Sequence, residues 1–276
     1  LIFISLFKKS KIILHFSGLG FFYVNNSIIF KFIRLIIELT FKHLKKNSTF
    51  CIFENLDDFD YFTKSKKIFK INNCLHIRGV GVDVNRFKKV QKKHYQFTVL
   101  MVSRITEEKG VNDFLNCYSL FSQDNRFKFI LIGQYEKSKK NEILINKKNI
   151  FKKNKNFEYY KWRSDIKKFY DIANVSVLPS YREGLSVFLL ESLASGLPVI
   201  CSNVIGNKNL VKNDYNGYLV NINSPNEIRD SIMLLFQNKN KYNELSLNSR
   251  KLSEELYNEN IILQNFSKFL RENKIL

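Results

Sequence analysis

Two glutamates, Glu183 and Glu191, stand on either side of a glycine-containing loop and the start of an apolar helical pattern. Ser186 has the residue type and the position of a helix N-cap, so the amides of residues 184–187 would present free N–H groups to an anion. Both carboxylates could then face one crevice and accept hydrogen bonds from paired hydroxyls. Either glutamate alone could be a solvated charge, but together with a phosphate cradle they indicate a nucleotide-sugar pocket.

A second pair of charges lies in an earlier loop. Arg104 and Lys109 follow the apolar run 98–102 and precede a helical pattern that begins at Val111. A planar guanidinium and a compact ammonium in one loop can neutralise a diphosphate leaving group without a metal ion. The four charges can act together only if the fold brings their two loops to the same place.

The hydropathy pattern predicts elements that would do this, because short apolar runs alternate with helical patterns over the last two thirds of the chain. Such alternation predicts an α/β fold, a doubly wound parallel sheet in which ligands bind at the carboxyl ends of the strands. The expected strands are residues 98–102, 127–133, 157–161, 175–178, 199–202 and 217–220. The expected helices are residues 111–121, 137–148, 166–173, 187–195 and 207–212, with more from 226 onward.

The N-terminal third shows a shorter alternation. Strands are expected at residues 12–17, 49–54 and 68–72, with a helix over 27–46 and a short helix from Leu56. A turn-rich segment and the basic run 88–94 mark the boundary between the two parts. The expected domains are therefore residues 1–88, residues 89–258, and a C-terminal helix over 259–276.

Charge and composition narrow the function classes. The 276 residues contain 45 Lys and Arg against 25 Asp and Glu, a net charge of +20. Such a field favours phosphates, nucleic acid or an anionic membrane, although A/T-rich coding would also enrich lysine. No nucleic-acid motif is present, so a basic nucleic-acid-binding module is the least favoured class. The charged stripe on helix 27–46 fits either a membrane interface or a helix packed on its own sheet.

The four cysteines lack metal-ligand spacing and lie mostly in apolar runs, which is typical of buried thiols in a reducing, cytoplasmic compartment. No run of 18 residues is free of charge, so a membrane span is not expected. Asp58 and Asp60 fall at an expected helix start and are interpreted as helix-terminal charges, so no metal site is expected.

These motifs resemble the family 4 glycosyltransferases of the two-domain GT-B fold. The specific part of the match is the pair of glutamates with SYREG around the first of them; the matching segments are residues 79–87, 101–111, 129–133, 162–172, 177–202 and 216–220. SGLG at 17–20 and FENLDD at 53–58 are similar to bacterial enzymes that build capsule, O-antigen or lipid-linked oligosaccharides. The resemblance therefore implies a role in cell-surface polysaccharide biosynthesis.

The resemblance implies a retaining transfer from a nucleotide-diphosphate sugar, with a UDP-sugar expected, to a lipid-linked diphosphate or glycan acceptor at the inner face of the plasma membrane. It assigns catalytic roles to Arg104 and Lys109 on the diphosphate and to Glu183 on the sugar hydroxyls, and the ribose to Glu191. No metal, cofactor or protein nucleophile is implied, since the donor phosphate itself takes the acceptor proton. The other expected donor-binding residues are Gly184, Leu185, Ser186, Val187, Trp162 and Arg163.

Two positions depart from the family pattern. Ser17 stands where many relatives carry histidine, and His15 is interpreted as a strand residue. Residues 204–209 lack the usual glycine and glutamate that face the donor, which leaves the donor sugar open.

The resemblance also implies a first domain that lacks N-terminal strands and is covered by the last helix. We therefore expect this chain to bind a donor without transferring its sugar. The alternatives are a soluble acceptor and a non-catalytic nucleotide-sugar-binding remnant.

Overall fold

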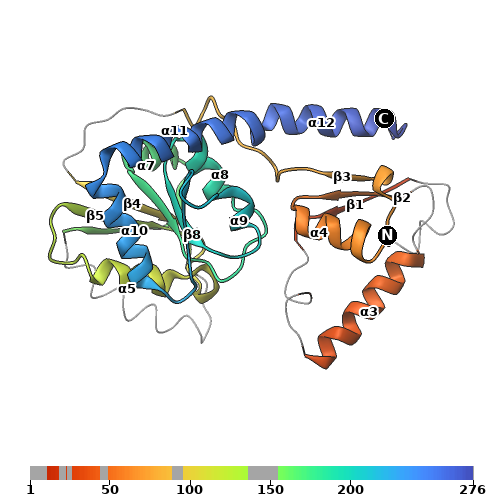
Figure 1. The fold of residues 1–276 in the computed structure, drawn as a ribbon, viewed down its shortest axis with the longest axis horizontal. Coiled ribbons are helices and arrows are strands. Elements are labelled where there is room, and N and C mark those ends of the chain that lie inside the picture. Colours follow the sequence, from red (N-terminus) through yellow and green to blue (C-terminus); the bar gives the residue numbers. More distant parts are fainter. Residues whose placement is uncertain are drawn as a thin grey trace. The chain divides into compact units, whose positions relative to one another are not determined.

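The computed structural model describes residues 11–18, 23, 27–43, 49–88, 96–135 and 155–275 (Figure 1). The chain divides into two compact units. One unit combines Leu1–Gly81 with Glu259–Leu276, and the other is Val82–Asn258. Each unit contains its own parallel sheet, so each is described by itself.

The second unit is built on a six-stranded parallel sheet in the order β6-β5-β4-β7-β8-β9. The near-continuous apolar strands are buried because helices cover both faces of the sheet. The strand order reverses between β4 and β7, and such a switch point is where open α/β sheets bind ligands. The strands are β4 Phe97–Val102, β5 Phe127–Ile132, β6 Phe157–Tyr160, β7 Val175–Leu178, β8 Val199–Ser202 and β9 Gly217–Val220.

Helix α10 of this unit packs against α5 and α11, and α11 packs against α8 (Figure 1). They are α5 Val111–Ser119, α7 Lys167–Ile172, α8 Val187–Ala194, α9 Asn207–Leu210, α10 Pro225–Gln237 and α11 Lys239–Leu256. The structure confirms the six expected strands to within one residue at each end. The helix expected at 137–148 lies outside the described residues.

The first unit carries a three-stranded parallel sheet in the order β1-β2-β3. Its strands are β1 Ile12–Phe16, β2 Thr49–Phe53 and β3 Cys74–His76, and its α-helices in the described ranges are α3 Ile28–His43, α4 Leu56–Asp60 and α12 Glu259–Glu272. On one side, Phe53 and Phe62 lie in a cluster of aromatic rings. On the other, Phe269 and Leu270 of α12 pack on Phe50 of β2. The last helix of the chain thus completes the first unit.

The strand expected at residues 68–72 is wrong. Ile68 and Phe69 are buried, but both backbone N–H groups donate to the carbonyl of Phe62, at 2.8 and 3.3 Å, and not to a neighbouring strand. The apolar pair closes the π-helical turn Tyr61–Ser65 over the core, and the strand begins only at Cys74. The apolar residues at 68–69 therefore indicate that this segment is buried, but not that it pairs with a strand.

The division between the units falls earlier than the boundary expected after residue 88. Val82, Val84 and Phe87 are buried in the core of the second unit, and Val82 forms a parallel bridge with Asn258. Arg250 also donates hydrogen bonds to the carbonyls of Val84 and Phe87. The segment from Val82 to Phe87 therefore belongs to the second unit.

Candidate functional site

A cavity of about 950 Å³ opens at the carboxyl ends of β4, β5, β6 and β7 in the second unit. Every site residue expected from the sequence except Gly184 lines it. The lining residues are Arg86, Val102, Ser103, Arg104, Lys109, Gln134, Trp162, Arg163, Ser164, Ile166, Leu178, Glu183, Leu185, Ser186, Val187, Phe188 and Glu191. The two charge pairs, which lie far apart in the sequence, thus line the same cavity.

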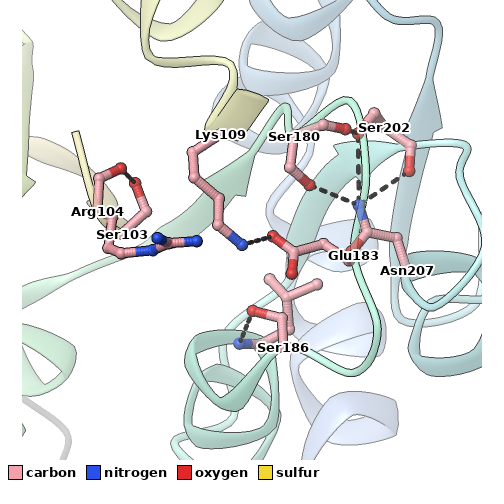
Figure 2. Close-up of polar contacts among 9 residues, drawn as sticks. Ser103, Arg104, Lys109, Ser180, Glu183, Ser186, Ser202 and Asn207 are labelled. Atoms are coloured by element: carbon pink, nitrogen blue, oxygen red, sulfur yellow. Dashed lines mark hydrogen bonds and ion pairs between the residues drawn. The ribbon is translucent and has the colours of Figure 1, made fainter. Parts of the chain in front are cut away.

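Lys109 is positioned by the residue that follows it. Gly110 has φ +68°, and a Cβ atom there would lie 1.9 Å from the carbonyl oxygen of Pro179. Only glycine allows this close approach between the loop after β4 and the loop after β7. The approach brings the Lys109 Nζ to 2.6 Å from Glu183 Oε1, and Figure 2 shows the two side chains pointing toward one another.

The loop that carries the first glutamate rests on a buried polar network (Figure 2). Asn207 Nδ2 donates to the Ser202 carbonyl at 3.1 Å and to Ser180 Oγ at 3.3 Å, and the Ser202 hydroxyl donates to the Ser180 carbonyl. Gly206 has φ +91°, and a Cβ atom there would lie 1.9 Å from the carbonyl oxygen of Gly184. The start of α9 therefore fixes the backbone of this loop.

Helix α8 begins as expected. Ser186 is its N-cap, and the Ser186 Oγ accepts a hydrogen bond from the Leu189 amide at 3.4 Å, which confirms the predicted cap. Ser186 and Val187 line the cavity, so the positive end of the helix dipole adjoins it. The helix end adds to the positive charge of Lys109 and Arg104, whose guanidinium extends toward the Lys109 side chain in Figure 2.

Glu191 lies one turn further into α8. The Tyr170 hydroxyl donates to Glu191 Oε2 at 2.6 Å. Burial raises the pKa of Glu191, whereas the Tyr170 hydrogen bond and the positive charge of Arg86 act to lower that pKa. These two neighbours therefore support the ionised carboxylate that could accept ribose hydroxyls.

Arg86, which lines the cavity, and Tyr170, which bonds Glu191, were not predicted from the sequence. Arg86 lies inside the matching segment 79–87, and its guanidinium sits 5.2 Å from the Phe87 ring centroid. Phe87 in turn makes an edge-to-face contact with Tyr170. Arg86 could have been proposed from the sequence as a site residue, because it is a charged residue directly before an aromatic residue in a segment that matches the family. Tyr170 gives no local signal, because its partner is 21 positions away on another helix.

The rim of the cavity is aromatic and basic. The Trp162 side chain is largely solvent-exposed and offers an indole face for stacking on a nucleobase. Arg163 forms an ion pair with Asp165 at 2.7 Å and lies over the Tyr160 ring. Gln134 adds an amide that can both donate and accept hydrogen bonds.

The first unit holds one further pair of polar side chains at the carboxyl end of its sheet. His15 Nε2 lies 3.0 Å from Glu54 Oε1, so the histidine that the sequence places in strand β1 is partnered by the residue after β2. Within the described ranges, the structure shows no group of three or more His, Cys, Asp or Glu side chains that could hold a metal ion.

Two units, each with its own parallel sheet, and a cavity at the carboxyl ends of the strands of one sheet define the GT-B class of α/β proteins. The fold is similar to that of Anabaena HepE in complex with UDP, at a TM-score of 0.80 and 14% identity, covering 98% of this chain and 75% of that chain. Residues 83–252 match the family described as Glycosyl transferases group 1, and the chain belongs to this family, the family 4 glycosyltransferases.

Two curated bacterial relatives are similar to much of the chain. The Campylobacter jejuni N,N'-diacetylbacillosaminyl-diphospho-undecaprenol alpha-1,3-N-acetylgalactosaminyltransferase is 26% identical over 91% of this chain and 68% of its own length. The Escherichia coli UDP-Gal:alpha-D-GlcNAc-diphosphoundecaprenol alpha-1,3-galactosyltransferase is 28% identical over 65% of this chain and 48% of its own length. The chain thus spans two thirds of the first relative's length and about half of the second's.

Proposed function

We propose that this protein is a retaining glycosyltransferase that uses a nucleotide-diphosphate sugar, in the first instance a UDP-sugar, as donor. The observation that carries the proposal is the cavity in which Arg104, Lys109, Glu183 and Glu191 meet at the switch point of a parallel sheet. Cations suit a diphosphate and carboxylates suit hydroxyls, and a nucleotide sugar is the ligand class that presents both. The UDP-bound structural neighbour and the UDP-Gal enzyme among the relatives support uridine as the nucleoside of the donor.

Each side chain then has a place along the donor. The diphosphate lies against Arg104, Lys109 and the N-terminus of α8, where positive charge is concentrated. The sugar hydroxyls donate to Glu183 and the ribose hydroxyls donate to Glu191. Trp162 edges the base through its exposed indole.

The chemistry follows from where negative charge develops. As the bond from the sugar to the diphosphate breaks, charge grows on the leaving phosphate oxygen, and Arg104, Lys109 and the helix end stabilise it. The acceptor hydroxyl attacks the same face of the sugar and passes its proton to that phosphate oxygen. The configuration at the sugar carbon is retained without a protein nucleophile.

We propose a lipid-linked diphosphate or a growing polysaccharide as the acceptor, met at an anionic membrane surface. The names of both relatives specify diphospho-undecaprenol acceptors, and the net charge of +20 favours anionic surfaces. Helix α3 leaves an apolar face largely exposed, made of Ile28, Ile29, Phe32, Leu35, Ile36 and Leu39. In the part of the chain that the structure describes, no helix has the length and apolar character needed to cross a bilayer.

Thermal-shift measurements with a panel of nucleotide sugars test the donor site, and transfer of labelled sugar to an undecaprenyl-diphosphate-linked acceptor tests the reaction. A shift with one nucleotide sugar and transfer to the lipid support the whole proposal. Transfer to a soluble sugar alone would replace the lipid acceptor. Binding without transfer, the behaviour that the sequence leads us to expect of this chain, would support the donor site and leave a nucleotide-sugar-binding protein. Tight binding of duplex DNA without affinity for any nucleotide would contradict the assignment.

A further inference from the structure

Two of the charges that would bind the donor already bind each other. The Lys109 Nζ lies 2.6 Å from Glu183 Oε1, and the two side chains are only 21% and 7% exposed. In the proposed function, Lys109 serves the diphosphate and Glu183 serves the sugar. While this ion pair persists, part of the charge of each group is neutralised by the other and is not available to a ligand.

Burial decides what opening the pair requires. A carboxylate as buried as that of Glu183 is strongly destabilised when it loses its counter-charge without a replacement. A ligand with a diphosphate but no sugar attracts Lys109 and offers nothing to Glu183. A ligand that also carries a sugar donates hydroxyl hydrogen bonds to Glu183 and so compensates for the loss.

The backbone on both sides of the pair limits other ways to relieve this competition. Lys109 is followed by Gly110, which is packed against the Pro179 carbonyl, and Glu183 is followed by Gly184, which is packed against Gly206. A shift of either loop would disturb these tight contacts. Only the side chains of Lys109 and Glu183 can therefore move to exchange their ion pair for contacts with a ligand.

We propose that the Lys109–Glu183 ion pair makes the site prefer a nucleotide-diphosphate sugar over the free nucleotide diphosphate that the reaction leaves behind. This inference rests on the proposed function. Once the sugar has been transferred, Glu183 loses its hydroxyl partners, and re-formation of the ion pair favours release of the product. The pair is a specificity-determining device within the donor site.

Isothermal titration of the protein with UDP, GDP and ADP, and with the sugar conjugates of each, tests the inference on Glu183→Gln. This substitution removes the negative charge and keeps the shape, so Lys109 becomes available to the diphosphate. The variant should bind the free nucleotide diphosphate about tenfold more tightly, the scale of one charge-assisted hydrogen bond. Its preference for the sugar conjugate should fall by a similar factor.

The matched control is Glu38→Gln. Glu38 is a buried carboxylate of the first unit, its side chain 9% exposed, and it pairs with Lys66 at 3.3 Å. This variant loses the same charge from a lysine pair whose carboxylate is similarly buried, and we expect its nucleotide affinities to equal those of the unmodified protein. Unchanged or weaker binding of the free diphosphate by Glu183→Gln would overturn the inference and leave the proposed function standing. If the unmodified protein binds no nucleotide and no nucleotide sugar, the proposed function itself fails.

A second measurement needs no variant. UDP is titrated into the unmodified protein with and without saturating glucose, galactose or their N-acetyl derivatives. If hydroxyls on Glu183 release Lys109, the matching monosaccharide should tighten UDP binding severalfold, and UDP should tighten monosaccharide binding by the same factor. UDP affinity that is insensitive to every one of these sugars would contradict the inference.

Discussion

Glu191 and Glu183 differ in what surrounds each carboxylate. Glu191 receives a hydrogen bond from Tyr170, whereas Glu183 is held by Lys109. The two residues should therefore contribute differently to donor binding, although Glu183 lies in the loop that leads into α8 and Glu191 lies in α8 itself. Substitutions that remove one carboxylate at a time should separate those contributions.

We expect Glu191→Ala to weaken binding of both UDP and UDP-sugar by about 1.5–3 kcal/mol, the scale of a hydrogen bond to a charged group. Glu183→Ala should leave UDP binding at least as tight as in the unmodified protein and suppress sugar transfer. Calorimetry measures the first effect and product formation the second. If both variants bind and turn over as before, the two carboxylates take no part in donor binding or transfer.

The environment of Glu191 predicts a dependence on pH. Burial raises the pKa of its carboxyl, so affinity for a nucleotide sugar should fall on acidification at a higher pH than for an ordinary glutamate. The Tyr170 hydrogen bond opposes this shift because it stabilises the charged form. Tyr170→Phe should therefore move the loss of affinity to still higher pH.

Affinity for a UDP-sugar across a pH series measures this shift, since the esterified diphosphate of that ligand does not titrate in the same range. Tyr242→Phe is the control, because burial also raises the pKa of Tyr242, but its side-chain hydrogen bond is with Asn174 and not with Glu191. Identical pH profiles for Tyr170→Phe and the unmodified protein would show that the tyrosine does not position the carboxylate.

At the scale of elements, the site depends on loops pressed together at the sheet edge. Gly110 lets the loop after β4 approach the carbonyl of Pro179, and this approach sets where Lys109 stands. We expect Gly110→Ala to destabilise the second unit by about 3 kcal/mol, because a Cβ atom meets backbone at 1.9 Å and the left-handed φ disfavours alanine.

Chemical denaturation measures this loss. Gly196→Ala is the control, since Gly196 has the same φ of +68° as Gly110 but follows the C-cap of α8 and is not in the loop that carries Lys109. We expect the control to lose less stability and to retain nucleotide affinity. Equal losses in the two variants would mean that the close approach contributes nothing beyond backbone strain.

Much of this arrangement follows from sequence patterns that are local. The strands of the second sheet are buried apolar runs with turns on either side, so periodicity locates them, and Ser186 is a cap whose partner lies three residues away. The strand expected at 68–72 failed because Ile68 and Phe69 are buried by a turn, and burial alone does not reveal which groups their amides bond.

The rest of the site depends on long-range contacts. Tyr170 meets Glu191 only when α7 and α8 pack together, and Lys109 meets Glu183 only when two loops 74 residues apart touch. The sequence could predict which charges belong to the pocket. It could not predict which of them would be partnered by one another.

At the scale of the whole molecule, charge and the exposed face of α3 act together. We expect association with vesicles that contain anionic lipid, and expect it to fade as salt rises toward about 0.5 M, where surface charges are screened within a few ångströms. Phe32→Asp, on the exposed apolar face, should reduce association at low salt. Leu247→Asp is the control, because Leu247 is an exposed apolar residue of the second unit. Vesicle sedimentation measures both, and binding that survives high salt or neutral lipid would contradict the electrostatic account.

In the sequence, the two segments of the first unit precede and follow the second unit, so the ribosome completes the first unit last. Phe50 of β2 packs against Phe269 of α12, yet the whole of Val82–Asn258 is translated between them. At ordinary elongation rates this interval lasts on the order of ten seconds or more. The second unit can therefore fold while the nascent first sheet still exposes the apolar side that α12 will cover, and we expect chaperones to bind that side during translation.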